Sequence, residues 1–98
     1  MRTIYLKFDK TLTSLAGNKY GQDVFEKQVG ALDYEQTYKI IFPSEIKNIA
    51  TSFIQGFFQS FVKTFGLIRL DQKIEIESLI PNLKETILKS LDWRRNWW

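Results

Sequence analysis

A two-sided helical pattern between Asn48 and Gly66 constrains the fold more than any other part of this chain. Its apolar residues recur three and four positions apart, which is the spacing of one helix face. Gly66 follows the last of them, where a helix can end in a left-handed turn. The pattern predicts a helix whose aromatic side faces the core. The residues of this side are Phe53, Ile54, Phe57, Phe58, Phe61, Val62 and Phe65.

The start of this helix carries side chains suited to capping. Thr51 and Ser52 have hydroxyls that can accept a hydrogen bond from a free backbone N–H, and Gln55 stands three positions after Ser52, as in a capping box. We therefore expect Ser52 to cap the helix.

The opposite stripe of the same helix carries a single charge, whereas solvated faces are usually richer in Lys and Glu. A weakly charged face suits a protein partner, so we expect partner binding through this stripe, and above all through Ser52, Gln55, Gln59 and Lys63. The stripe consists of Ser52, Gln55, Gly56, Gln59, Ser60 and Lys63.

Strand patterns and helix patterns alternate along the rest of the chain, which predicts an α/β fold with a largely parallel sheet. Residues 9–16 fit either a hairpin return strand or a loop. Residues 37–42 are nearly continuous in apolar character, which indicates a central strand buried on both faces. The other expected elements are a strand over 3–8, a helix from Gly17–Gly21 to about Leu32, a strand over 74–77, and a last helix with Pro81 in its first turn.

Composition excludes several kinds of chemistry. The 98 residues contain no Cys and no His, which excludes disulfides, Cys or His zinc sites, thiol nucleophiles and imidazole bases. Glu75 and Glu77 alternate with Ile74 and Ile76, so we interpret them as a solvated strand face and predict no metal and no cofactor. The remaining polar residues form no recognisable catalytic constellation, and we expect no enzyme. One domain over 1–98, without a signal peptide or membrane span, favours a cytoplasmic protein.

The chain also resembles a known family. The segments Leu15-Ala16-Gly17-Asn18-Lys19-Tyr20-Gly21-Gln22-Asp23-Val24-Phe25 and Thr51-Ser52-Phe53-Ile54-Gln55-Gly56-Phe57-Phe58, with the closing Phe65-Gly66, are similar to small bacterial STAS-like domains. The resemblance covers about 15–77.

This resemblance implies the fold of anti-sigma-factor antagonists, a mixed sheet with helices mainly on one face. It also implies a non-enzymatic regulatory module that docks on an ATP-binding, kinase-like protein. The candidate phosphoacceptors that it implies are Ser52 and its neighbour Thr51. Ala50 and Phe53 replace the acidic and glycine positions that flank the phosphoacceptor in the family.

The tail over 92–98 is rich in Trp and Arg and fits several roles. Trp93 and Trp97 stand four positions apart and can pack on the domain from one face of a last helix. Trp97 and Trp98 can also form a surface for a protein partner or a homodimer, and we favour packing or such an interface. An alternative is a nucleic-acid-binding protein or a phage or defence-system effector that uses Arg94, Arg95 and the indoles, but two arginines are a small basic footprint. A membrane anchor is the third alternative.

Overall fold

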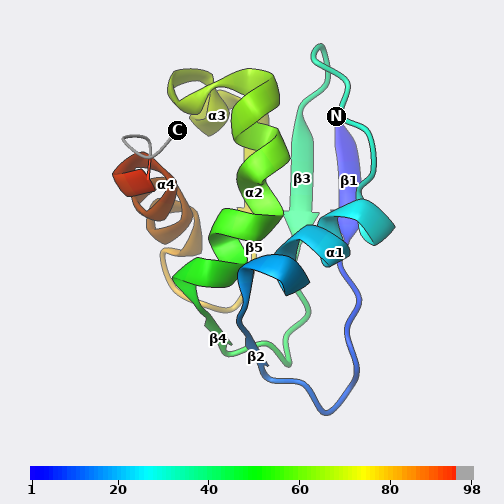
Figure 1. Ribbon diagram of the computed structural model, residues 1–98. Helices are drawn as coiled ribbons and strands as arrows, with labels where there is room; N and C mark the ends of the chain where they lie inside the picture. Colours follow the sequence, from blue (N-terminus) through cyan, green and yellow to red (C-terminus); the bar gives the residue numbers. More distant parts are fainter. Residues whose placement is uncertain (95–98) are drawn as a thin grey trace.

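The computed structural model describes the backbone of residues 1–94 and the side chains of residues 1–92. Strands and helices alternate along most of this length (Figure 1). The elements are β1 (Arg2–Tyr5), β2 (Ser14–Leu15), α1 (Asn18–Gln28), β3 (Tyr38–Ile41), β4 (Asn48–Ile49), α2 (Thr51–Phe65), α3 (Leu67–Lys73), β5 (Ile74–Glu77) and α4 (Leu83–Arg94).

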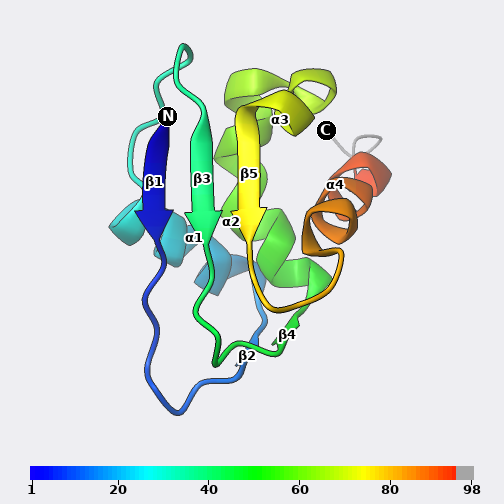
Figure 2. The same ribbon diagram turned by 180° about the vertical axis from the view of Figure 1, so that it is seen from behind.

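The main sheet contains three parallel strands in the order β1-β3-β5. Each crossover between neighbouring strands carries its helices to the same side, as right-handed connections require when the strand order follows the sequence. Figure 1 shows α1 and α2 in front of the sheet, and Figure 2 shows the strands uncovered from behind. The predicted α/β class, with a largely parallel sheet and helices on one face, is confirmed. Every strand pairing in the described part of the chain is parallel.

A second, two-stranded sheet joins the segments that lead into α1 and α2. Ser14 and Leu15 pair in parallel with Asn48 and Ile49, so the hairpin alternative for residues 9–16 is wrong. The chain therefore passes twice through the same order of elements, β1-β2-α1 and then β3-β4-α2. Because β2 and β4 pair directly before the two helices, the starts of α1 and α2 lie beside each other.

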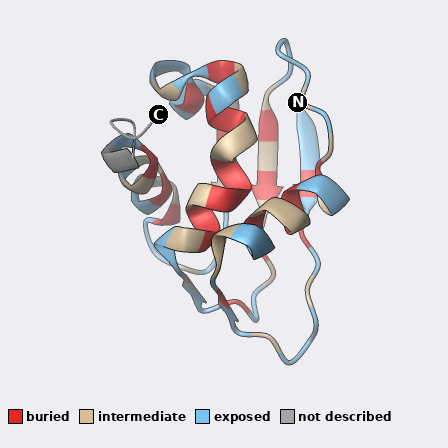
Figure 3. Cartoon of the chain, in the orientation of Figure 1, coloured by how far each residue is buried: buried red, intermediate tan, exposed pale blue. Residues whose placement is uncertain are grey.

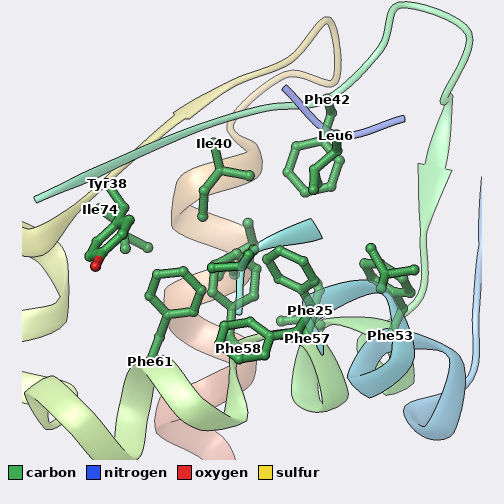
Figure 4. Packing of buried hydrophobic residues seen from close by; sticks show 14 of the residues in the cluster. Leu6, Phe25, Tyr38, Ile40, Phe42, Phe53, Phe57, Phe58, Phe61 and Ile74 are labelled. Carbon is green, nitrogen blue, oxygen red and sulfur yellow. The ribbon is translucent and has the colours of Figure 1, made fainter. Parts of the chain in front are cut away.

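The core lies between α2 and the sheet. Phe53, Phe57, Phe61 and Phe65 form a row along α2, and successive ring centroids are 5.8, 6.1 and 6.4 Å apart. Figure 4 shows Phe58 and Phe61 of α2 on the side of the sheet residues Tyr38, Ile40 and Ile74, and Figure 3 shows the buried stripe along α2. All the apolar residues predicted for this helix face are buried. Burying one such side chain contributes about 1.5–3 kcal/mol. Among the described elements, α2 therefore makes the largest single contribution to the hydrophobic core.

The central position of β3 is confirmed, but its predicted burial on both faces is wrong. Tyr38 and Ile40 point into the core and are fully buried, whereas Lys39 and Ile41 are half-buried on the other face. The continuous apolar character of residues 37–42 does not distinguish the two faces of β3. No helix in residues 1–94 covers the second face, which is why Lys39 and Ile41 are only half-buried.

Several element boundaries differ from the sequence prediction. α1 ends at Gln28 rather than near Leu32, because Gly30 has a positive φ of 77° and its N–H bonds back to the Phe25 carbonyl. α3 is a short helix that the pattern did not predict. The last helix begins at Leu83, after a left-handed Asn82, so Pro81 lies outside its first turn.

Candidate functional site

Ser52 does not cap α2, and the predicted capping box is wrong. The N-cap residue is Ala50, in an extended conformation that continues β4, and no side chain donates or accepts a capping bond there. The Ser52 hydroxyl instead accepts a hydrogen bond from the backbone N–H of Gly17, at 2.9 Å. It ties the loop before α1 to the first turn of α2.

The first turn of α2 nevertheless lies at the surface. Thr51 is exposed, and Ser52 is half-buried because of its contact with Gly17. Of the two candidate phosphoacceptors, Thr51 therefore has the more accessible hydroxyl. The same turn presents helix N-terminal N–H groups, which stabilise negative charge.

The predicted polar stripe of α2 is interrupted where α1 crosses it. Gly56 is buried against the backbone of Asn18, and a Cβ on Gly56 would overlap the Asn18 carbonyl oxygen. Gly21 of α1 lies reciprocally against α2, where a Cβ would come within 2.5 Å of the Phe53 oxygen. Gly56 is thus a helix-crossing residue, and its assignment to an exposed stripe is wrong.

The rest of the stripe reaches the surface along α2. We call its remaining residues the polar strip of α2. Most of them are half-buried, and the Lys63 ammonium is the single full charge among them. Both α1 and α4 pack against α2, the helix that carries the strip. Its members are Ser52, Gln55, Gln59, Ser60 and Lys63.

The predicted tail residues Trp97 and Trp98 lie outside the residues that the structure describes. The structure therefore places only four of the predicted partner-binding residues, and all four lie on α2. They are Ser52, Gln55, Gln59 and Lys63. They share one helix, so their alignment follows from the helical repeat.

Two pockets that were not predicted from the sequence lie at the carboxyl ends of β1 and β3. One has a volume of about 340 Å³ and lies between the segment after β1 and the segment around Ile46. The other, of about 380 Å³, lies between the segment after β1 and α1. Lys7, Phe8 and Asp9 line both. Residues 9–16 have no clear periodicity, so no pattern could have indicated these pockets.

Two titratable groups on the second pocket have shifted pKa values. Hydrogen bonds from the Thr11 backbone N–H and the Thr11 hydroxyl, at 2.9 and 2.7 Å, lower the pKa of Asp9. Partial burial raises the pKa of the Tyr20 hydroxyl. Asp9 therefore stays ionised and Tyr20 stays protonated at neutral pH, which gives neither group the pKa of a general acid or base near pH 7.

Two features are absent from residues 1–94, the part of the chain that the structure describes. No group of three or more acidic side chains in this part of the chain is placed to hold a metal ion. None of its helices combines the length and the apolar character that crossing a bilayer requires.

Comparison of the chain with family models, with curated proteins and with solved structures finds no match.

Proposed function

We propose that this chain is a non-enzymatic protein-interaction module that docks on another protein through the first turn and the polar strip of α2. The observation that carries the proposal is the division of α2 into two faces. Its apolar residues are all buried in the core, and the strip that reaches the surface presents hydroxyls, amides and one ammonium. Neutral polar groups cost less to desolvate than ionised ones, so this strip suits a protein interface.

The identity of the partner class rests on the resemblance to STAS-like domains, which implies an ATP-binding, kinase-like regulator. The position of Thr51 and Ser52 is compatible with regulation at this surface. A phosphate on Thr51 would lie at the start of α2, where the helix dipole stabilises it. A phosphate on Ser52 would have to replace the bond to Gly17 and would separate the starts of the two helices.

Site-directed photocrosslinking tests the docking face. A photoreactive residue at Gln59 should crosslink a single ATP-binding protein in host cells, and the same residue at Lys89, exposed on α4, is the matched control. Equal crosslinking from both positions, or crosslinking from Lys89 alone, would contradict docking through α2.

Two substitutions measure the contribution of the strip. Gln59→Glu and Lys63→Glu should leave the free energy of unfolding within about 0.5 kcal/mol, since surface changes are usually that small. Both should weaken binding to the crosslinked protein, whereas Lys89→Glu should not. Mass spectrometry of protein from its own host then decides the role of the hydroxyls, since a phosphate on Thr51 or Ser52 identifies a switch.

A further inference from the structure

The segments of β1 and β3 stop pairing at Pro43. The last backbone hydrogen bond between them runs from the Leu6 N–H to the Ile41 carbonyl, at 3.0 Å. In the register of the sheet, the next bond would join the N–H of residue 43 to the Leu6 carbonyl, and Pro43 has no N–H to donate. The two segments separate there, as Figure 2 shows below the main sheet. They meet again where the Lys47 N–H bonds to the Thr13 carbonyl, at 2.7 Å, next to the β2–β4 pair.

The pocket of about 340 Å³ lies between the two separated segments, and its floor is apolar. Leu6 and Ile46 are buried, at 3% and 1% exposure, so the floor belongs to the core. The volume is at the small end of the roughly 300–1,000 Å³ that small-molecule sites occupy, which fits a ligand of the size of a single amino acid. The apolar lining residues are Leu6, Phe8, Leu12, Pro43 and Ile46.

Hydrogen bonds and a ring contact fix the wall of the pocket that follows β1. The Gln28 side chain binds both backbone groups of Lys7, because its Oε1 accepts from the N–H and its Nε2 donates to the carbonyl, each at 2.7 Å. A backbone hydrogen bond of 2.9 Å closes the turn over 9–12. The Phe8 ring contacts Phe53 edge-on, with ring centroids 6.5 Å apart. The pocket is therefore preformed, as ligand sites usually are.

Four charged side chains surround this pocket, two ammoniums and two carboxylates. All four are exposed and therefore lie at its rim, and none of them forms an ion pair with another residue in the described part of the chain. Two hydrogen bonds from Thr11 hold the Asp9 carboxylate in place. A rim with charges of both signs above an apolar floor complements a zwitterion with an apolar side chain. The four residues are Lys7, Asp9, Lys10 and Glu45.

We propose that this pocket binds a free α-amino acid with an apolar side chain. The side chain packs on the floor against Ile46, the carboxylate pairs with the ammonium of Lys7 or Lys10, and the α-ammonium pairs with a carboxylate of the rim. Each of these pairs is exposed to water and contributes little, so binding is weak and the site responds to millimolar concentrations. No residue of the pocket belongs to the polar strip of α2, so this proposal does not rest on docking through that strip.

NMR titration of ¹⁵N-labelled protein with L-phenylalanine at millimolar concentrations tests the site. The backbone amide signals of Phe8, Leu12 and Ile46 should shift in a saturable way. L-Alanine lacks the large apolar side chain and should produce no saturable shift. 3-Phenylpropionate lacks the ammonium and 2-phenylethylamine lacks the carboxylate. Each should bind about threefold or more weakly than L-phenylalanine, which is the loss expected for one exposed ion pair.

Two variants test the floor and the rim separately. Leu12→Trp fills the pocket with a larger side chain and should abolish the shifts at Phe8 and Ile46. Lys10→Glu should weaken the binding of L-phenylalanine and of 3-phenylpropionate by about threefold or more, but not that of 2-phenylethylamine. Lys89→Glu is the matched control, because Lys89 is exposed on α4, and it should change none of these affinities. Thermal unfolding verifies that each variant is folded.

Four results would overturn the proposal. The first is the absence of saturable shifts at the pocket amides in wild type, and the second is an equal affinity for L-phenylalanine and its two analogues. The third is unchanged binding in a folded Leu12→Trp protein. The fourth is a loss of affinity in Lys89→Glu equal to that in Lys10→Glu.

Discussion

At the residue scale, the hydrogen bond from the Gly17 N–H to the Ser52 hydroxyl joins segments 35 positions apart in the chain. Ser52→Ala should therefore lower the free energy of unfolding by about 1–2 kcal/mol, because it leaves a partly buried N–H without an acceptor. Thr51→Ala is the matched control, since Thr51 is exposed, and it should stay within about 0.5 kcal/mol of wild type.

Urea unfolding measures both variants, and hydrogen exchange at Gly17 localises the effect. Exchange of the Gly17 amide should become faster only in Ser52→Ala. Equal destabilisation by both variants with unchanged exchange at Gly17 would mean that the Ser52 hydroxyl does not hold this loop.

The turn at Asp9 gives a second prediction at this scale. Two hydrogen bonds from Thr11 lower the pKa of Asp9 below its usual value near 3.8, and the backbone bond is the larger cause. Since the folded pKa is lowered, ionised Asp9 stabilises the fold above the unfolded pKa. This contribution is lost as the pH falls through the folded pKa.

Thr11→Val removes the hydroxyl and keeps the backbone N–H. The pKa of Asp9 should then rise part of the way toward 3.8, as followed by carboxyl ¹³C NMR during an acid titration. Thr13→Val, an exposed position with no bond to Asp9, should leave that pKa unchanged. A pKa of Asp9 that is the same in wild type and Thr11→Val would show that the hydroxyl bond does not form in solution.

At the scale of elements, the crossing of α1 over α2 depends on a glycine in each helix. Gly56→Ala should destabilise the fold by about 1–3 kcal/mol or more, because the new methyl group overlaps the Asn18 carbonyl and forces the helices apart. This loss exceeds the gain of up to about 1 kcal/mol that Ala has over Gly in a helix.

Ser60→Ala, one turn further along the same helix, is the control for helix propensity. Ser60 is half-buried and makes no close crossing, so its replacement should be neutral or slightly stabilising. Thermal unfolding of both variants tests the crossing. A Gly56→Ala protein as stable as Ser60→Ala would show that the helices are farther apart than the structure places them.

The elements also show which features the sequence could predict. The core side of α2 was predictable, because seven apolar residues at helical spacing leave one way to bury them. The end of α2 was predictable from Gly66, whose φ is 80°. The role of Ser52 was not, because its hydroxyl is used by a residue from another segment, and capping rules consider local sequence only. Gly56 was misassigned for the same reason. A small residue on a polar stripe gives no sign of whether a second helix crosses there.

At the scale of the whole molecule, the strand order explains why one face of the sheet is open. Strands that follow one another in space as in sequence, with right-handed crossovers, send the crossover helices to the same side. The alternation of elements predicted the largely parallel sheet, and the resemblance to STAS-like domains implied helices mainly on one face. Neither showed that β3 is open on one side, because half-buried Ile41 has the same apolar character as the core residues around it. The uncovered face of the sheet thus lies on the side of the domain opposite to the helices (Figure 2).

The last helix, α4, gives a prediction about the stability of the whole domain. Leu83, Ile87 and Leu91 of α4 are buried, at 5%, 0% and 0% exposure, and α4 packs on α2. A chain that ends at residue 82 loses three buried side chains worth about 1.5–3 kcal/mol each, a loss comparable with the 5–15 kcal/mol that stabilises a typical domain.

We therefore expect the chain that ends at residue 82 to be unfolded or molten by circular dichroism and NMR. The matched control ends at residue 94, which keeps all three α4 anchors, and it should remain cooperatively folded. Sedimentation of this control also tests the predicted role of Trp97 and Trp98. Association that persists without the tail would contradict a homodimer contact through these tryptophans. Association lost together with the tail, in a protein that remains fully folded, would assign the homodimer contact to them.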